Sequence, residues 1–199
     1  YRPNRPALVG RFGNPITLSA RPSTAQESNV RHDDSLAVAR AEALGALLQL
    51  VGYAVWQVAE CEDALAHWVA IAARETRGIG EAAAEPIVAK VQRKTFGQLL
   101  NEIRDADVLD AGLVDRVQAL VRSRNWLVHH AKRENRGVVN DMARYDRLAA
   151  RLGEIAEEAT KLQSELGREL EEYIVRAGVD RTAVDAEAAR LQREWGYAE

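Results

Sequence analysis

The stretch Arg122-Ser123-Arg124-Asn125-Trp126-Leu127-Val128-His129-His130 interrupts a strong helical pattern and decides how the chain is interpreted. Apolar residues around it recur at alternating spacings of three and four, which predicts one buried face of a helix over 111–133. These residues are Leu113, Val117, Leu120, Leu127 and Ala131. Arg124 occupies the position where this series lacks an aliphatic side chain. Burying a charge without a partner is costly, so we expect Arg124 to have something to bind.

Asn125 and His129 add further polar groups at the margin of this apolar face. Asn125 interrupts a second apolar row, and His129 follows it by four residues, one helical turn away. Arg124 and His129 are five residues apart and do not share one face, but an arginine is long enough to reach sideways. A permanent cation, an amide and a group that titrates near neutrality suit the binding of a phosphate.

Length and composition indicate a mainly helical protein with a real core. The chain has 199 residues, of which 47% are hydrophobic, and it has a net charge of −3. This charge argues against indiscriminate coating of nucleic acid. Residues 116–136, however, hold six basic residues and one acidic residue, a local charge of +5. Such a patch favours a polyanion site, and a solvated helix face is the alternative.

The periodicity predicts an all-α fold: an up-and-down bundle of four to five core helices with an extended N-terminal arm. The arm, 1–34, contains prolines and arginines, the bundle covers 35–176, and a C-terminal helix lies within 177–199. The predicted helices are 36–77, 86–93, 96–104, 111–133, 138–176 and 181–195. In the first of these helices, Leu44, Leu48, Val51, Val55 and Val69 widen the apolar stripe, so we expect that helix to be buried around much of its circumference.

Several kinds of chemistry lack a sequence signal. Cys61 is the only cysteine, which excludes an internal disulfide and fits a reducing compartment. No spacing of histidines, cysteines or carboxylates is typical of a metal site, and no nucleophile triad or phosphate loop is visible. We therefore expect no metal and no cofactor, with any chemistry carried by Arg124, Asn125 and His129. No signal peptide or uninterrupted apolar run of membrane-spanning length is visible, so we expect a cytoplasmic protein without a membrane partner.

The motif Arg124-Asn125-x-x-x-His129 resembles the Arg-x(4–6)-His signature of the HEPN superfamily. The segment Thr95-Phe96-Gly97-Gln98-Leu99-Leu100 upstream is also similar to bacterial HEPN proteins, and the resemblance covers roughly residues 36–175. One departure is Ala131, because toxin members paired with a nucleotidyltransferase often carry a tyrosine two residues after the histidine. Regulation by modification of that tyrosine is therefore not expected here.

The resemblance implies a metal-independent endoribonuclease of toxin or phage-defence type, acting as a homodimer with a composite site. His129 would then transfer protons, Arg124 would bind the scissile phosphate and Asn125 would orient them. RNA-binding residues would be Arg122, His130, Lys132 and Arg133. The expected partners are RNA, a second copy of the chain, and a cognate antitoxin or another defence-system protein.

Two alternatives stay open beside the ribonuclease. In one, the bundle binds RNA, a nucleotide or a protein partner without cutting anything. In the other, Arg124 and Asn125 meet acidic residues of a neighbouring helix, such as Glu60 or Glu62, and hold the dimer together.

Overall fold

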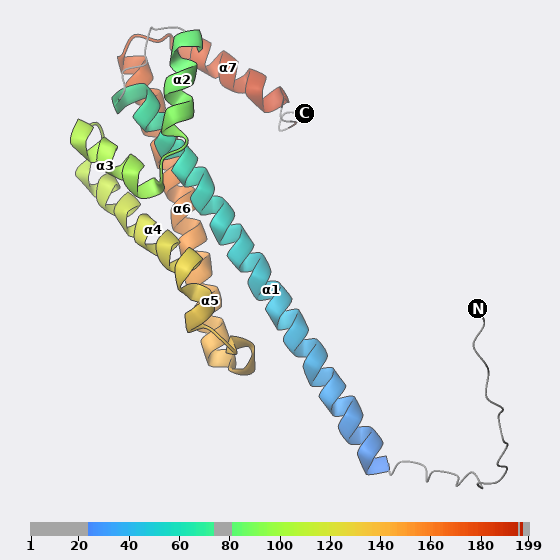
Figure 1. The fold of residues 1–199 in the computed structure, drawn as a ribbon. Helices are drawn as coiled ribbons and strands as arrows, with labels where there is room; N and C mark the ends of the chain where they lie inside the picture. Colours follow the sequence, from blue (N-terminus) through green and yellow to red (C-terminus); the bar gives the residue numbers. More distant parts are fainter. Residues whose placement is uncertain (1–23, 74–80, 195, 197–199) are drawn as a thin grey trace, which may run out of the picture. The chain divides into compact units, whose positions relative to one another are not determined.

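The computed structural model describes residues 24–73, 81–194 and 196 of the chain. Within these residues every regular element is helical, so the predicted all-α class is confirmed. The elements are α1 (Thr24–Trp68), η1 (Val69–Ala73), α2 (Glu81–Val91), α3 (Phe96–Ala106), α4 (Ala111–His129), α5 (Ala131–Glu134), η2 (Val138–Asn140), α6 (Met142–Arg176) and α7 (Arg181–Glu194). Figure 1 shows them in sequence colours.

The chain divides into two compact units, residues 1–39 and 40–199. In the first unit the described residues are the start of α1, which begins at Thr24, well before the predicted start near Leu36. Helix therefore replaces the last part of the predicted extended arm. The rest of that arm lies outside the described residues.

The second unit holds the core, in which α4 packs against both α3 and α6 (Figure 1). The expected stripe of α4 is buried at Leu113, Val117, Leu120 and Leu127. The spacing of apolar residues predicts a seam along α6 from Met142 to Tyr173. This seam is buried from Leu148 to Leu166, but Met142 is 71% exposed. Trp68 of α1 joins this core, and its indole N–H donates a 2.8 Å hydrogen bond to the Leu166 carbonyl. That bond satisfies the polar atom of the largest fully buried side chain.

Local sequence signals explain most helix boundaries. Thr95 and Gln98 have the spacing of a capping box, and both hydrogen bonds of that box form at the start of α3. Asp110 precedes the apolar series of α4 and is therefore a candidate cap in the sequence. Its carboxylate does cap α4, accepting hydrogen bonds from the Gly112 and Leu113 N–H groups. Gly137 ends the break between α5 and η2 with a φ of +72°, a backbone conformation that glycine adopts without strain.

Three predicted boundaries were wrong in detail. Pro86 lies inside α2 rather than in its first turn, because the alanine-rich residues before it extend the helix to Glu81. The predicted helix over 111–133 is interrupted at His130, so α4 and the short α5 are separate elements. The helix predicted from 138 begins as the 3-10 turn η2, and α6 starts only after Asp141, whose side chain caps it.

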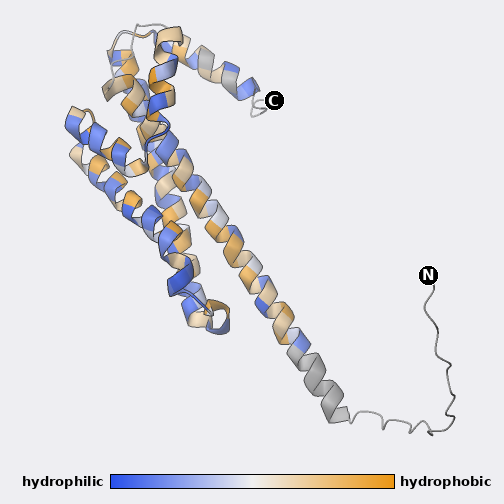
Figure 2. Ribbon diagram, viewed as in Figure 1, coloured by the Kyte–Doolittle hydropathy of each residue, from blue (hydrophilic) through white to orange (hydrophobic). Residues whose placement is uncertain are grey.

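The expectation that α1 is buried around much of its circumference was also wrong. Leu47, Ala54, Val58, Cys61 and Leu65 are buried on one face. Of the residues expected to widen that stripe, Val69 is buried, Val51 is half-buried, and Leu44, Leu48 and Val55 are exposed. Figure 2 shows hydrophobic residues along much of α1, whereas α5 is largely hydrophilic. The sequence showed no uninterrupted apolar run of membrane-spanning length, but one described stretch, Asp34–Ala73, is long and apolar enough to cross a membrane by length and composition alone. Core helices of soluble proteins also pass this test, although they are mostly buried and only 6% of this apolar window is.

Candidate functional site

Arg124 lies half-buried between α4 and α1. It borders a cavity of about 90 Å³ together with Val55, Val58, Ala59, Glu62, Leu127 and Val128. The carboxylate across this cavity, Glu62, is partly desolvated, which raises its pKa above the ordinary value. The positive charge of Arg124 and a hydrogen bond from the Phe96 backbone N–H both act to lower that pKa. Arg124 therefore faces a carboxylate of its own chain, as one of the sequence alternatives anticipates.

Asn125 and His129 are exposed to solvent. Neither residue borders the cavity that Arg124 lines. Five residues along an α-helix correspond to a rotation of about 140°, so His129 lies on a different side of α4 from Arg124. Among the described residues no hydrogen bond or ion pair joins them. One protomer thus presents the three residues of the motif without assembling them into one site.

The predicted RNA-binding residues surround the end of α4 and are all exposed. Arg122 is on α4, and Lys132 and Arg133 are on α5. The His130 and His129 rings are 6.4 Å apart between centroids and nearly perpendicular. The guanidinium of Arg133 lies 3.2 Å from Nδ1 of His130, where it acts as the donor. These side chains form a cationic surface at the α4–α5 break.

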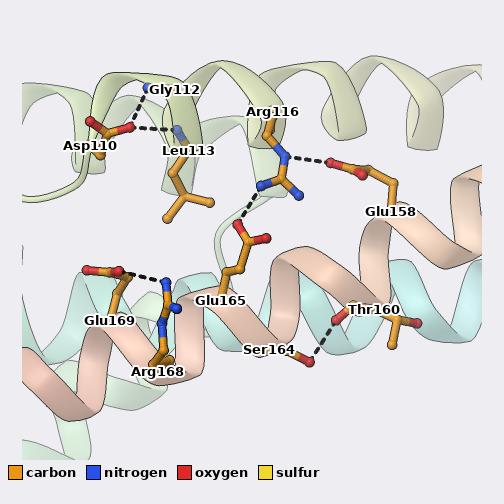
Figure 3. Close-up of polar contacts among 10 residues, drawn as sticks. All are labelled: Asp110, Gly112, Leu113, Arg116, Glu158, Thr160, Ser164, Glu165, Arg168 and Glu169. Atoms are coloured by element: carbon orange, nitrogen blue, oxygen red, sulfur yellow. Dashed lines mark hydrogen bonds and ion pairs between the residues drawn. The ribbon is translucent and has the colours of Figure 1, made fainter.

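Arg116, in contrast, does not contribute to this surface, although it belongs to the basic stretch of the sequence. Its guanidinium donates a 2.9 Å hydrogen bond to Glu158 and a second bond to Glu165, both on α6 (Figure 3). The two carboxylates raise the pKa of Arg116 above its already high value. The charge of Arg116 is therefore neutralised between α4 and α6.

A second group of arginines was not predicted from the sequence. Arg144, Arg147 and Arg151 of α6 line a cavity of about 300 Å³ with Trp126 of α4. Their spacing of three and four residues was a usable signal, since it places all three on one helical face. We overlooked it because α6 was interpreted by its apolar seam alone.

Cys61 and the acidic residues offer no reactive or metal-binding group in the described part of the chain. The thiol of Cys61 is buried, and burial, with the charges of Glu158 and Glu62, raises its pKa to about 12. Residues 24–73, 81–194 and 196 contain no cluster of three metal-ligating side chains.

Comparisons with known proteins add no further information about the site: no family model, no curated protein and no solved structure matches this chain. The HEPN resemblance therefore rests on the residues of the motif, and the activity that it implies is a proposal.

Proposed function

We propose that this protein is a metal-independent endoribonuclease of toxin or phage-defence type that acts as a homodimer in the cytoplasm. Asn125 and His129 are exposed next to Arg122, Lys132 and Arg133, which is the observation that carries the proposal. Cleavage by the RNA 2′-hydroxyl requires a proton acceptor, a proton donor and a cation at the phosphate. His129 is suited to accept the 2′-hydroxyl proton and return it to the departing 5′-oxygen, Arg124 is suited to stabilise the charge on the phosphate, and Asn125 would orient the reacting groups.

A second copy of the chain would bring the dispersed motif together. Exposed apolar side chains occupy the helix faces next to Arg124: Leu44, Leu48 and Val55 on α1, with Val128 on α4. Val55 and Val128 border the same cavity as Arg124, so this apolar surface continues up to the guanidinium. In a two-fold dimer, coverage of this surface would place the His129 of one copy near the Arg124 of the other.

Binding of RNA without cleavage is the second candidate function, and the position of Glu62 favours it. A guanidinium that faces a carboxylate of its own chain is partly neutralised before any phosphate arrives. In that case the exposed cations at the α4–α5 break hold RNA, and Arg124 only connects α4 to α1. A cognate antitoxin or other defence protein would then bind the same face.

Purified protein incubated with end-labelled RNA and EDTA separates the two candidates. We expect cutting that survives chelation and is lost in both Arg124→Ala and His129→Ala, with Arg176→Gln as a distant control. Mixing the two inactive variants should restore about a quarter of the activity, because half of the dimers would be mixed and each would have one intact composite site. RNA binding without any cutting would instead support the second candidate.

The dimer itself has a separate test. Leu48 is 61% exposed, so Leu48→Asp should leave the monomer folded but dissociate the pair in size-exclusion chromatography with light scattering. Met142→Asp introduces the same charge at a residue that is 71% exposed on α6 and should leave the mass unchanged. A wild-type monomer at all concentrations would contradict the composite site. Association with lipid vesicles would contradict the expectation that the protein has no membrane partner.

A further inference from the structure

Three arginines of α6 form one side of the cavity that contains Trp126. Arg144, Arg147 and Arg151 project from one helical face, and the cavity is completed by Trp126, Glu134, Asn135 and Leu148. With a rise of about 1.5 Å per residue, the three α-carbons extend over about 10 Å of α6. The residues around the cavity carry three positive charges and one negative charge. This is an excess of positive charge in a protein whose net charge is −3.

Neighbouring groups hold two of the three arginines, Arg151 and Arg144, without neutralising them. The Arg151 guanidinium carbon lies 3.4 Å from the centroid of the Trp126 ring, a cation–π contact. Arg144 donates a 3.1 Å hydrogen bond to the backbone carbonyl of Glu134. The Glu134 carboxylate accepts a 2.7 Å hydrogen bond from the Trp126 indole. The one carboxylate at the cavity is thus engaged by an indole N–H.

In the described part of the chain, no ion pair to a carboxylate is formed by Arg144, Arg147 or Arg151. Two arginines elsewhere in the bundle do have such partners: Arg116 pairs with Glu158 and Glu165 of α6, and Arg168 pairs with Glu169. A planar guanidinium with open donors is the preferred protein group for phosphate oxygens. The cavity therefore has the composition of an anion site.

We propose that this cavity binds the phosphodiester backbone of single-stranded RNA and leads it to His129. Arg122 lies on α4 four residues before Trp126, on the same side of the helix, and His130 lies four residues after Trp126 at the break that follows α4. His130 in turn adjoins His129. A strand held by the three arginines thus continues over residues already predicted to bind RNA. The identification of the anion as RNA rests on the proposed function. The cationic character of the cavity is independent of that proposal.

Trp126 positions Arg151 in this site. One ring face is covered by Arg151, and the indole N–H is occupied by Glu134. Recognition through phosphates alone is independent of base sequence and depends strongly on salt. We therefore expect RNA binding at this site with little sequence preference.

The test measures RNA binding separately from RNA cleavage. Full-length protein carrying His129→Ala is titrated into a fluorescein-labelled single-stranded oligouridine, and anisotropy gives the affinity at several salt concentrations. Each phosphate contact to a single strand contributes about 0.7 to the slope of log affinity against log salt. Adding Arg147→Gln and Arg151→Gln should reduce the slope by about 1.4 and weaken binding at least about tenfold at moderate salt.

The controls separate a local site from overall charge. Arg147 lines the cavity and forms no ion pair within the described residues, so Arg147→Gln alone should reduce the slope by about 0.7 with an unchanged thermal midpoint. Arg176→Gln removes the same charge about 44 Å further along α6 and should change neither slope nor affinity.

Three outcomes would contradict the inference. If RNA binds but the Arg147 and Arg151 variants match their parent, the cavity is not the RNA site, although the proposed ribonuclease stands. If Arg176→Gln weakens binding equally, overall charge explains the effect and the site is rejected. If no variant or wild-type protein binds RNA, both this inference and the proposed function fail.

Discussion

The two ends of the α4–α6 contact use arginine in opposite ways. At one end Arg116 of α4 is held by two glutamates of α6, and its charge is neutralised (Figure 3). At the other end Arg151 of α6 lies over Trp126 of α4, and Arg144 and Arg147 lie beside it without a carboxylate partner among the described residues. The first arrangement joins two helices, whereas the second leaves cationic donors available to a ligand.

The charge distribution of α6 explains this difference. Residues 142–151 contain three arginines and one aspartate, whereas 154–172 contain seven glutamates and only two basic residues. The acidic segment supplies the carboxylates that Arg116 meets, and the basic segment has few of its own. One helix thus stabilises the bundle along its acidic part and offers an anion site at its start.

Removing the packing that both ends share should have the largest effect. Leu120 is 2% exposed and lies on α4 between Arg116 and Trp126. Leu120→Ala should lower the free energy of unfolding by about 3 kcal/mol, because a buried leucine is replaced by a cavity. Urea denaturation followed by circular dichroism measures the change. A loss below about 1 kcal/mol would show that the two ends are held independently of this packing.

Neutralising Arg116 should lower the free energy of unfolding by less than Leu120→Ala does, and it should leave RNA binding unchanged. The three side chains are each more than a third exposed, so Arg116→Gln should lower the free energy of unfolding by only about 1 kcal/mol. The cost arises because Glu158 and Glu165 then lose their shared cation, and it should decrease with added salt. Arg168→Gln, whose partner Glu169 is its neighbour in sequence, is the matched control with almost no cost. Weaker RNA binding by Arg116→Gln would contradict the contrast between the ends.

The sequence predicted the apolar framework of this comparison better than its polar contacts. The spacing of Leu113, Val117, Leu120 and Leu127 placed the buried face of α4, because burial of apolar residues follows helical period. Ion pairing does not follow that period. Arg116 binds two glutamates more than forty positions away in the sequence, and these become its partners only because of how α4 and α6 are aligned side by side. The same limitation hid the arginines of α6, whose significance depends on Trp126 lying opposite.

The motif residues show a further limit of sequence reasoning. The gap at Arg124 correctly indicated a polar group at an apolar interface, and Glu62 was among the partners considered. The exposure of Leu44, Leu48 and Val55 was not anticipated, because a second apolar row predicts burial whether or not a neighbour covers it. Apolar periodicity identifies the residues to be buried but not the chain that buries them.

Trp126→Phe, which keeps the net charge, tests whether the arginines at the start of α6 depend on the tryptophan opposite them. Trp126→Phe removes the indole N–H that holds the Glu134 carboxylate, so that carboxylate becomes free to pair with Arg144 or Arg151. We expect about 0.5 kcal/mol of lost stability, since this hydrogen bond is exposed. The salt slope of RNA binding should fall by about 0.7, as for one lost phosphate contact. Unchanged RNA binding would show that Trp126 does not control the arginines.

The smallest expected effect concerns Glu62, which decides whether Arg124 resembles the neutralised or the available arginines. The pKa of Glu62 is raised in the folded state, chiefly by burial, so the folded protein retains that proton to a higher pH than the unfolded chain does. The stability contributed by protonated Glu62 is therefore fully present below the pKa of Glu62 in the unfolded chain. It is lost as the pH rises through the pKa of Glu62 in the folded protein. Glu62→Gln removes this titration, so its stability relative to the wild type should increase from pH 4 to pH 7 in parallel thermal melts. If Glu62→Gln binds RNA more tightly at pH 7, Arg124 is available to a ligand, as Arg144 and Arg147 are. If Glu62→Gln instead loses much of its stability at pH 7, Arg124 joins two helices, as Arg116 does.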